Sequence, residues 1–246
     1  MNKRNNVIKA ITTMAVLIAI MIVFSFMSIN IGGGFVITLI GVPVAIAATL
    51  YGPYVGAIMG FVWGTISIIQ GVTGYDASGP ILMAYSPFGL VVTCYIPRIL
   101  CGGVTGLVAA LNKKWDKKGF VTSLCSAALV PVLNTSLFLS CYLGYFLNSD
   151  GVQSFLNSCV TKYGFDPNNL FLFLVFGFGL NFILELAVNL VVDIPSCMYL
   201  LKAKDKMNMT LPYLDFQFKK KEVVETTSNE ETSSNQDNTS NEDLSK

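Results

Sequence analysis

Three polar residues interrupt three separate apolar segments of the chain: Arg98, Asn134 and Glu185. A guanidinium, an amide or a carboxylate inside the hydrocarbon core of a membrane is expensive, so such groups mark either a buried pair or the site of a bound ligand. Asn181 and Asn189 lie four residues on either side of Glu185, a spacing that places all three on one stripe of a helix. The sequence therefore predicts a polar binding site inside the bilayer, formed by these five residues.

Two interpretations of this polar group stay open. In the structural one, Arg98 and Glu185 form an ion pair and the amides hydrogen-bond between helices, as buried polar groups often do. In the functional one, Arg98 binds an anionic group of a ligand near the middle of the bilayer. Pro97 and Pro131 remove helical hydrogen bonds close to Arg98 and Asn134. Such breaks are tolerated where the freed groups face protein or a cavity, and the two interpretations are compatible.

The composition predicts an integral membrane protein. Of the 246 residues, 53% are hydrophobic and only 13% are charged, whereas soluble domains carry about 25% charged residues. A helix needs about 20 apolar residues to cross the hydrocarbon core. We therefore expect an all-α membrane domain over residues 1–206 with six transmembrane helices, the second of them short. They lie approximately at residues 7–27, 36–50, 54–70, 88–111, 120–147 and 170–201.

Basic residues precede the first segment, fill the connection between the fourth and fifth, and follow the sixth. With six spans, all three clusters fall on one side of the membrane, and Lys162 is the single basic residue in the opposite connections. Lys and Arg beside short connections favour the cytoplasm, so both termini are predicted to be cytoplasmic. The first segment has no convincing small-residue cleavage site after it, and we expect it to be retained. The clusters are Lys3, Arg4 and Lys9; Lys113, Lys114, Lys117 and Lys118; and Lys202, Lys204 and Lys206.

The end of the chain changes character. Residues 207–221 form a basic juxtamembrane segment, which ends in three lysines that could contact anionic lipid. Residues 222–246 contain seven acidic residues and one Lys, with Ser, Thr and Asn making up most of the rest. Such a composition cannot offset the entropy of ordering, so we expect a disordered acidic cytoplasmic tail. A solvated extension and a docking segment both fit this tail.

Small residues recur every four positions on three of the segments. Strips of this kind let helices approach closely inside a membrane. They predict packing surfaces, either between helices of this chain or with another subunit. The strips are Gly52, Gly56, Gly60 and Gly64 in the third segment, Gly102 and Gly106 in the fourth, and Ala15 and Ala19 in the first.

Three glycines, Gly32, Gly33 and Gly34, lie in the connection between the first two segments. Consecutive glycines give the backbone freedom to swing and to approach a ligand closely. A lid over an outward-facing pocket requires this freedom. An ordinary flexible connection accounts for the glycines equally well.

The residue types argue against catalysis in this chain. An intramembrane enzyme needs a nucleophile with a base, or metal ligands, within reach of one another, and the chain has no histidine. Its six cysteines show no C-x-x-C pairing, which favours buried thiols over a metal site or a disulfide framework. The sequence also contains no phosphate loop of the form G-x-x-x-x-G-K-[ST]. We expect neither an enzyme nor a metal or other cofactor, and any ATP hydrolysis should occur in other subunits.

Four stretches of the chain resemble the substrate-binding S components of energy-coupling-factor (ECF) vitamin transporters. The similarity covers nearly all of residues 7–201. The Pro-Arg of the fourth segment, the Asn-Thr of the fifth and the Glu of the sixth are most similar to the pantothenate-type branch. Leu133, which precedes Asn134, and the acidic tail depart from that pattern. The stretches are VITLIGVPVAIAATLYGPYVGAIMGFVWG (36–64), SPFGLVVTCYIPRILCGGVTGL (86–107), LVPVLNTSLFL (129–139) and NFILELAVNLVVDIP (181–195).

This resemblance implies a six-helix subunit of the cell membrane that captures a micronutrient from outside and delivers it together with partner subunits. It also implies docking on a transmembrane coupling subunit that carries two ATPases, through the small residues Ala15 and Ala19. In the alternative, these two alanines pack against helices of their own chain.

The vitamin stays open at the level of sequence. Pantothenate, a monoanionic acid, suits a single Arg98 with surrounding amides and hydroxyls, but riboflavin, folate, biotin and pyridine vitamins are further candidates. A self-sufficient secondary transporter of a small organic anion is the alternative function. Such transporters usually contain internal repeats, and the two halves of this sequence show no convincing repeat.

Overall fold

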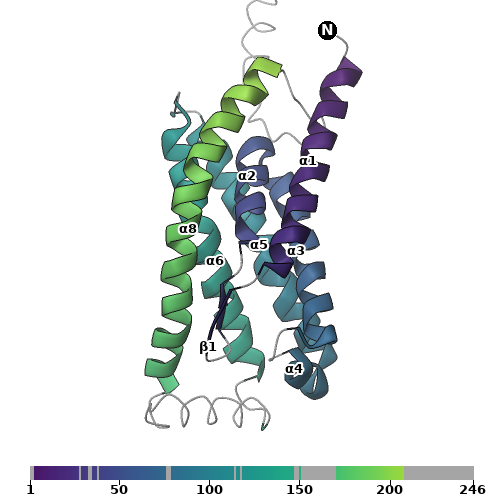
Figure 1. Cartoon of the computed structure of the whole chain (residues 1–246), viewed down its shortest axis with the longest axis vertical. Helices are drawn as coiled ribbons and strands as arrows, with labels where there is room; N and C mark the ends of the chain where they lie inside the picture. The colour runs from purple at the N-terminus through teal and green to yellow at the C-terminus, as the bar shows by residue number, and fades with distance from the viewer. Residues whose placement is uncertain are drawn as a thin grey trace, which may run out of the picture. The chain divides into compact units, whose positions relative to one another are not determined.

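The computed structural model describes residues 3–27, 29–32, 35–37, 39–75, 79–113, 115–116, 118–146, 150 and 170–207. These residues form helices and one short hairpin (Figure 1). The predicted all-α membrane fold is confirmed, with the hairpin and the short helix α4 as additions. The elements are α1 (Lys3–Phe26), β1 (Ile29–Gly32), β2 (Phe35–Ile37), α2 (Gly41–Tyr51), α3 (Pro53–Thr73), α4 (Gly79–Tyr85), α5 (Pro87–Asn112), α6 (Phe120–Phe146) and α8 (Leu170–Met207).

Five helices in the described part of the chain are long and apolar enough to cross a membrane: α1, α3, α5, α6 and α8. The predicted second segment is α2, which has 11 residues and is therefore about 16 Å long, roughly half the thickness of a hydrocarbon core. Its first predicted residues belong to β2 instead. The helix ends at Gly52, whose φ of 89° is a conformation that glycine adopts without strain, and Pro53 begins α3 directly afterwards.

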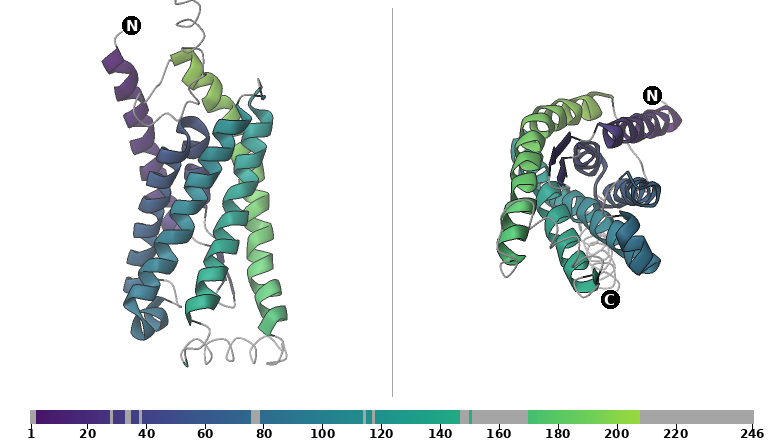
Figure 2. Two further views of the ribbon diagram at one scale, coloured as in Figure 1. Left: turned by 180° about the vertical axis from the view of Figure 1, so that it is seen from behind. Right: turned by 60° about the horizontal axis from the view of Figure 1, so that its bottom comes forward.

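The short helix α2 lies inside the bundle. All 11 of its residues are buried. In the right-hand view of Figure 2 it lies among the other helices, and it contacts α1, α3, α5, α6 and α8. Its side chains are almost all apolar, and the hydroxyl of Thr49 donates to the carbonyl of Ala45 at 2.7 Å. A helix with no polar face is stable only where neighbours cover it on every side, and that is its position here.

The glycine strips of α3 and α5 pack against each other. A Cβ atom on Gly56 would lie 2.1 Å from the carbonyl oxygen of Gly102, and one on Gly102 would lie 2.0 Å from that of Gly56. One turn away, a Cβ atom on Gly60 would lie 2.1 Å from the carbonyl oxygen of Arg98. Only glycine permits backbones this close. Of the two interpretations of these strips, packing within the chain is therefore the one realised.

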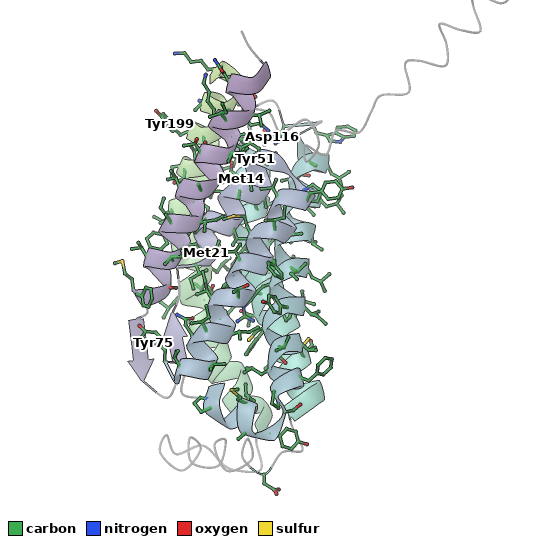
Figure 3. The ribbon with its side chains drawn as sticks, turned by 90° about the vertical axis from the view of Figure 1, so that its right-hand side faces the viewer. Met14, Met21, Tyr51, Tyr75, Asp116 and Tyr199 are labelled. Atoms are coloured by element: carbon green, nitrogen blue, oxygen red, sulfur yellow. The ribbon has the colours of Figure 1, made fainter. Side chains whose placement is uncertain are left out.

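Helix α1 packs on the bundle with one face only. Leu17 and Met21 are buried, and Figure 3 shows Met14 and Met21 on the side of α1 that faces the other helices. Ala15 and Ala19 lie on the exposed side of α1. Unlike the glycines of α3, these two alanines are exposed in the described part of the chain.

The basic clusters fall at one end of the helices. The N-terminal end of α1 and the C-terminal end of α8 lie together in Figure 1, and Asp116, between α5 and α6, lies at the same end in Figure 3. Asp116 begins α6 by accepting hydrogen bonds from the backbone N–H groups of Lys118 (3.1 Å), Gly119 (2.9 Å) and Thr122 (2.8 Å). Slight burial raises the pKa of Asp116, but these hydrogen bonds outweigh it and hold the pKa below its usual value. That this end faces the cytoplasm stays a prediction from charge.

Several expectations concern residues outside the described part. These are the connection at 148–169 with Lys162, apart from residue 150, then Gly33 and Gly34, and the tail beyond Met207. The division into a membrane domain at 1–206, a basic segment at 207–221 and an acidic tail at 222–246 therefore stays a prediction.

Candidate ligand site inside the helix bundle

The register of four helices can be read from a few contacts. The thiol of Cys101 on α5 donates to the carbonyl of Val130 on α6 at 3.3 Å. A Cβ atom on Gly41 of α2 would lie 3.0 Å from Val130 Cγ1 and 3.4 Å from Asn189 Nδ2 on α8. Gly41, Cys101, Val130 and Asn189 therefore share one level of the bundle, called here the middle layer. Helices α2, α5 and α8 run in one direction and α6 in the other (Figure 1).

One helical turn towards the start of α8, three of the predicted site residues come together. Asn134 on α6 and Glu185 on α8 lie four residues from the middle layer, or about 6 Å along each axis. Arg98 on α5 lies three residues from Cys101 in the same direction. The charges of Glu185 and Arg98 and the backbone of Asn134 all act on the thiol of Cys101. Glu185 Oε1 lies 3.8 Å from the position of a Cβ atom on Gly41. Arg98, Asn134 and Glu185 form the outer layer.

Arg98 is held by backbone carbonyls and aromatic rings. Its Nη1 donates to the carbonyls of Thr93 (3.1 Å) and Cys94 (3.0 Å). The Thr93 carbonyl is the one that Pro97 deprives of its helical donor, so the side chain next to the proline repairs the break. The guanidinium carbon lies 5.6 Å from the ring centre of Trp63 and 5.5 Å from that of Phe138, within the range of cation–π attraction.

Polar atoms of α6 and α8 meet no hydrogen-bond partner among the described residues. These atoms are Oδ1 of Asn134, Oε1 of Glu185 and both amide atoms of Asn189. Glu185 is only 3% exposed and Asn189 is fully buried. Arg98 acts on the Glu185 carboxylate through space, but the contacts described for the two side chains include no direct ion pair. A buried polar group without a partner is costly, so this cluster is suited to a ligand that supplies the missing donors and acceptors.

Two of the predicted residues stand apart from the outer layer. Asn189 lies one turn deeper, in the middle layer. Asn181 lies one turn beyond Glu185 on α8, and its side chain is outside the described part.

The sequence did not single out Trp63, Phe138 or Gly41 as site residues. The two aromatics flank Arg98, and an aromatic residue in an apolar segment is normally assigned to general packing. Gly41 begins α2 beside Glu185 and Asn189, where a side chain would have to displace Val130. Its signal was weak, because a single glycine inside an apolar segment is common in membrane helices.

The glycine-rich connection is partly a hairpin. β1 pairs antiparallel with β2, with Ile29 opposite Ile37 and Asn30 opposite Val36. Gly32 is the last residue of β1, while Gly33 and Gly34 lie outside the described residues. β2 lies beside α8 and ends four residues before Gly41, so the hairpin leads directly to the candidate site. Its role as a lid stays a prediction.

Comparison with models of known protein families gives a match. A family model described as "ECF transporter, substrate-specific component" matches residues 9–196. The match covers most of the chain and includes the outer and middle layers as well as Ala15 and Ala19. A search of curated proteins found no match.

Proposed function

The chain belongs to the ECF transporter substrate-specific component family, and from this membership we propose that it captures a vitamin, with pantothenate as the first candidate, for an ATP-driven importer. As a member of this family with five candidate membrane spans, it is a multi-pass protein of the cell membrane and a transport subunit. The vitamin, the residues that bind it and the mode of docking are the parts proposed here.

One observation carries the proposal: Arg98, Asn134 and Glu185, from three different helices, lie at one level inside the bundle. Pantothenate has one carboxylate, two hydroxyls and one amide. Arg98, fixed between Trp63 and Phe138, supports recognition of the carboxylate, because a guanidinium binds carboxylates through paired hydrogen bonds. The carboxylate of Glu185 can accept from the ligand's hydroxyls, and the amide of Asn134 can meet its amide.

Calorimetry against a small panel of vitamins tests the choice of ligand. The purified chain in detergent is titrated with pantothenate, riboflavin, folate, biotin and pyridoxine. Pantothenate should bind most tightly. Tyr199→Ala is a matched control, because Tyr199 is 74% exposed on the outer face of α8 (Figure 3), and this variant should bind as the parent does. If another vitamin binds more tightly than pantothenate, that vitamin would be the proposed ligand of the same site.

The proposed partners are a transmembrane coupling subunit and two ATPase subunits. Exposure of Ala15 and Ala19 on α1 supports docking through this helix, since a strip of small side chains lets a partner helix approach closely. Uptake by proteoliposomes should then need both ATP and the partner subunits. Uptake by this chain alone would instead support the secondary transporter of a small organic anion.

The glycines Gly32, Gly33 and Gly34 are proposed to close the site as the tip of a lid. Replacing all three with alanine should slow association and dissociation of the vitamin, because each Cβ atom restricts the backbone. Stopped-flow fluorescence measures both rates. Unchanged rates would make the hairpin an ordinary connection.

A further inference from the structure

The first residue of α2, Gly41, faces two polar side chains of the candidate ligand site. A Cβ atom on Gly41 would lie 3.4 Å from Nδ2 of Asn189 and 3.8 Å from Oε1 of Glu185, both on α8. Each of these two atoms is buried and has no hydrogen-bond partner among the described residues. An unsatisfied polar atom in a buried position is costly, so two of them beside one glycine indicate that an atom of a ligand belongs here.

The surroundings of Gly41 differ from those of the glycines that hold α3 against α5. A Cβ atom on Gly56 or Gly102 would lie 2.1 Å or 2.0 Å from a backbone oxygen of the facing helix. The three atoms nearest to a Cβ atom on Gly41 all belong to side chains, and the closest of them, Val130 Cγ1 on α6, is 3.0 Å away. Contact between backbones therefore does not require glycine at the start of α2.

The N-terminal end of α2 adds a hydrogen-bond donor to the same place. The first backbone N–H groups of an α-helix have no partner within the helix and carry a partial positive charge. In the part of the chain that the structure describes, no side chain caps α2. The N–H of Val42 donates to the carbonyl of Leu39 at 3.2 Å, and Pro43 has no N–H. The N–H of Gly41 can therefore donate to a ligand.

This combination of groups suits an uncharged hydroxyl. Glu185 accepts hydrogen bonds, the amide of Asn189 both accepts and donates, and the N–H of Gly41 donates. A hydroxyl can satisfy partners of both kinds, because it also donates and accepts. A second carboxylate on the ligand would face the charge of Glu185 in a buried site, where like charges repel strongly. An ammonium group would leave the donors of Asn189 and Gly41 unsatisfied.

We propose that Gly41 determines which ligands the site accepts, because its missing side chain lets a hydroxyl-bearing end of the vitamin reach Glu185 and Asn189. This inference rests on the proposed function and adds a direction to it, with the ligand's carboxylate at Arg98 and its hydroxyls at Gly41. Pantothenate carries its carboxylate at one end and its two hydroxyls towards the other, as this direction requires. A Cβ atom at position 41 would obstruct the approach of the hydroxyl end.

A set of alanine variants separates this role from packing. Gly41→Ala should weaken pantothenate binding about tenfold or more in calorimetry, because the Cβ atom obstructs hydrogen bonds to Glu185 and Asn189. It should also lower the unfolding temperature, since Val130 must shift. Gly103→Ala is the matched control: its Cβ atom would have Ala57 Cβ as its nearest neighbour, at 3.8 Å, and it should bind as the parent does.

The double variant Gly41→Ala/Val130→Ala removes the contact between the new Cβ atom and Val130. It is compared with Val130→Ala, which has the same shortened side chain on α6. The two should unfold at similar temperatures, but the double variant should still bind pantothenate about tenfold or more weakly. Equal affinity of these two variants would mean that Gly41 acts only through packing, and the proposal would be overturned.

Panthenol, in which an alcohol replaces the carboxylate of pantothenate, tests the direction of the ligand. Gly41→Ala should weaken binding of both compounds by a similar factor, because both carry the same hydroxyl end. Arg98→Ala should weaken pantothenate much more than panthenol. If Gly41→Ala weakened pantothenate alone, the carboxylate would lie at Gly41 and the proposed direction would be wrong.

Failure of this inference can be told apart from failure of the proposed vitamin. If riboflavin or pyridoxine, which also carry hydroxyls, binds the parent most tightly, the choice of pantothenate fails. Loss of that vitamin in Gly41→Ala/Val130→Ala, relative to Val130→Ala, would still support the role of Gly41. Tightest binding of biotin or folate, which have no alcohol group, would overturn it, and absence of binding to all five vitamins would overturn both proposals.

Discussion

Replacing Arg98 with alanine should weaken vitamin binding while the protein still inserts and folds. The guanidinium is positioned before the ligand arrives, by the carbonyls of Thr93 and Cys94 and by the rings of Trp63 and Phe138. It therefore loses little entropy when it binds an anion. Alanine removes both the positive charge and this preorganised fork of donors.

The size of the effect follows from these contacts. A hydrogen bond to a charged group contributes about 1.5–3 kcal/mol. We therefore expect a loss of about 2 kcal/mol or more in binding free energy, which is roughly a thirtyfold increase in Kd. Alanine also removes the donor from the Thr93 carbonyl, and an acceptor left unsatisfied in a buried position costs about 1–3 kcal/mol of folding stability. A lower unfolding temperature should accompany the weaker binding.

Calorimetry with the vitamin, together with thermal unfolding in the same detergent, separates the two effects. Arg98→Lys keeps the charge, but its single ammonium cannot reproduce the planar fork, so it should recover only part of the affinity. An unchanged Kd in folded Arg98→Ala would refute the binding role. Arg98 would then act only in the structure, by satisfying the Thr93 carbonyl and by balancing the charge of Glu185.

Three further predictions concern packing, docking and the start of α6. Gly102→Ala should lower the free energy of unfolding by about 1–3 kcal/mol through overpacking, because its Cβ atom would lie 2.0 Å from a carbonyl oxygen of α3. In its control, Gly103→Ala, the nearest atom is 3.8 Å from the new Cβ atom, so this variant should be neutral or stabilising in thermal unfolding. Equal effects of the two variants would contradict the close α3–α5 contact. Ala15→Trp or Ala19→Trp should keep vitamin binding in detergent but lose ATP-driven uptake and co-purification with a coupling subunit. If these variants also lost vitamin binding, this face of α1 would be assigned to packing within the chain. Asp116→Ala should lower the free energy of unfolding by about 1 kcal/mol, as loss of a helix cap does. The pKa of Asp116 is lowered in the folded state, so its contribution to stability is present above the ordinary pKa of about 3.9. This contribution is lost as the pH falls through the lowered pKa. Unfolding of parent and variant at neutral and acidic pH measures this, and a difference that persists unchanged at acidic pH would contradict the capping role.

Much of the fold could be predicted because long apolar runs and their ends are local features. The segments at 88–111 and 120–147 correspond closely to Pro87–Asn112 and Phe120–Phe146. The hairpin and α4 were missed, since runs of three to seven residues give no periodic signal that separates them from a connection. The glycine strips were recognised, but either a neighbouring helix or another subunit would need the same small residues. The pairing of Gly56 with Gly102 decided between them.

The candidate site was predictable in its members more than in its arrangement. The polarity of Arg98, Asn134 and Glu185 singled them out, because such residues are rare in apolar segments. Which of them share a level depends on the register between helices, and periodicity within one helix carries no information about its neighbours.

The short helix α2 explains how the polar layers are kept inside the protein. Gly41, beside Asn189, and Thr49, beside Cys197, lie two turns apart on α2, and Ala45 lies between them at the level of Asp193. Small side chains on this face leave room for the polar stripe of α8, and the remainder of α2 contacts the other helices. A longer, lipid-exposed helix here would leave the carboxylates of α8 without such a cover, at the cost of several kcal/mol for any group that faced the hydrocarbon. The shortness of α2 and the depth of the buried charges are therefore parts of one arrangement.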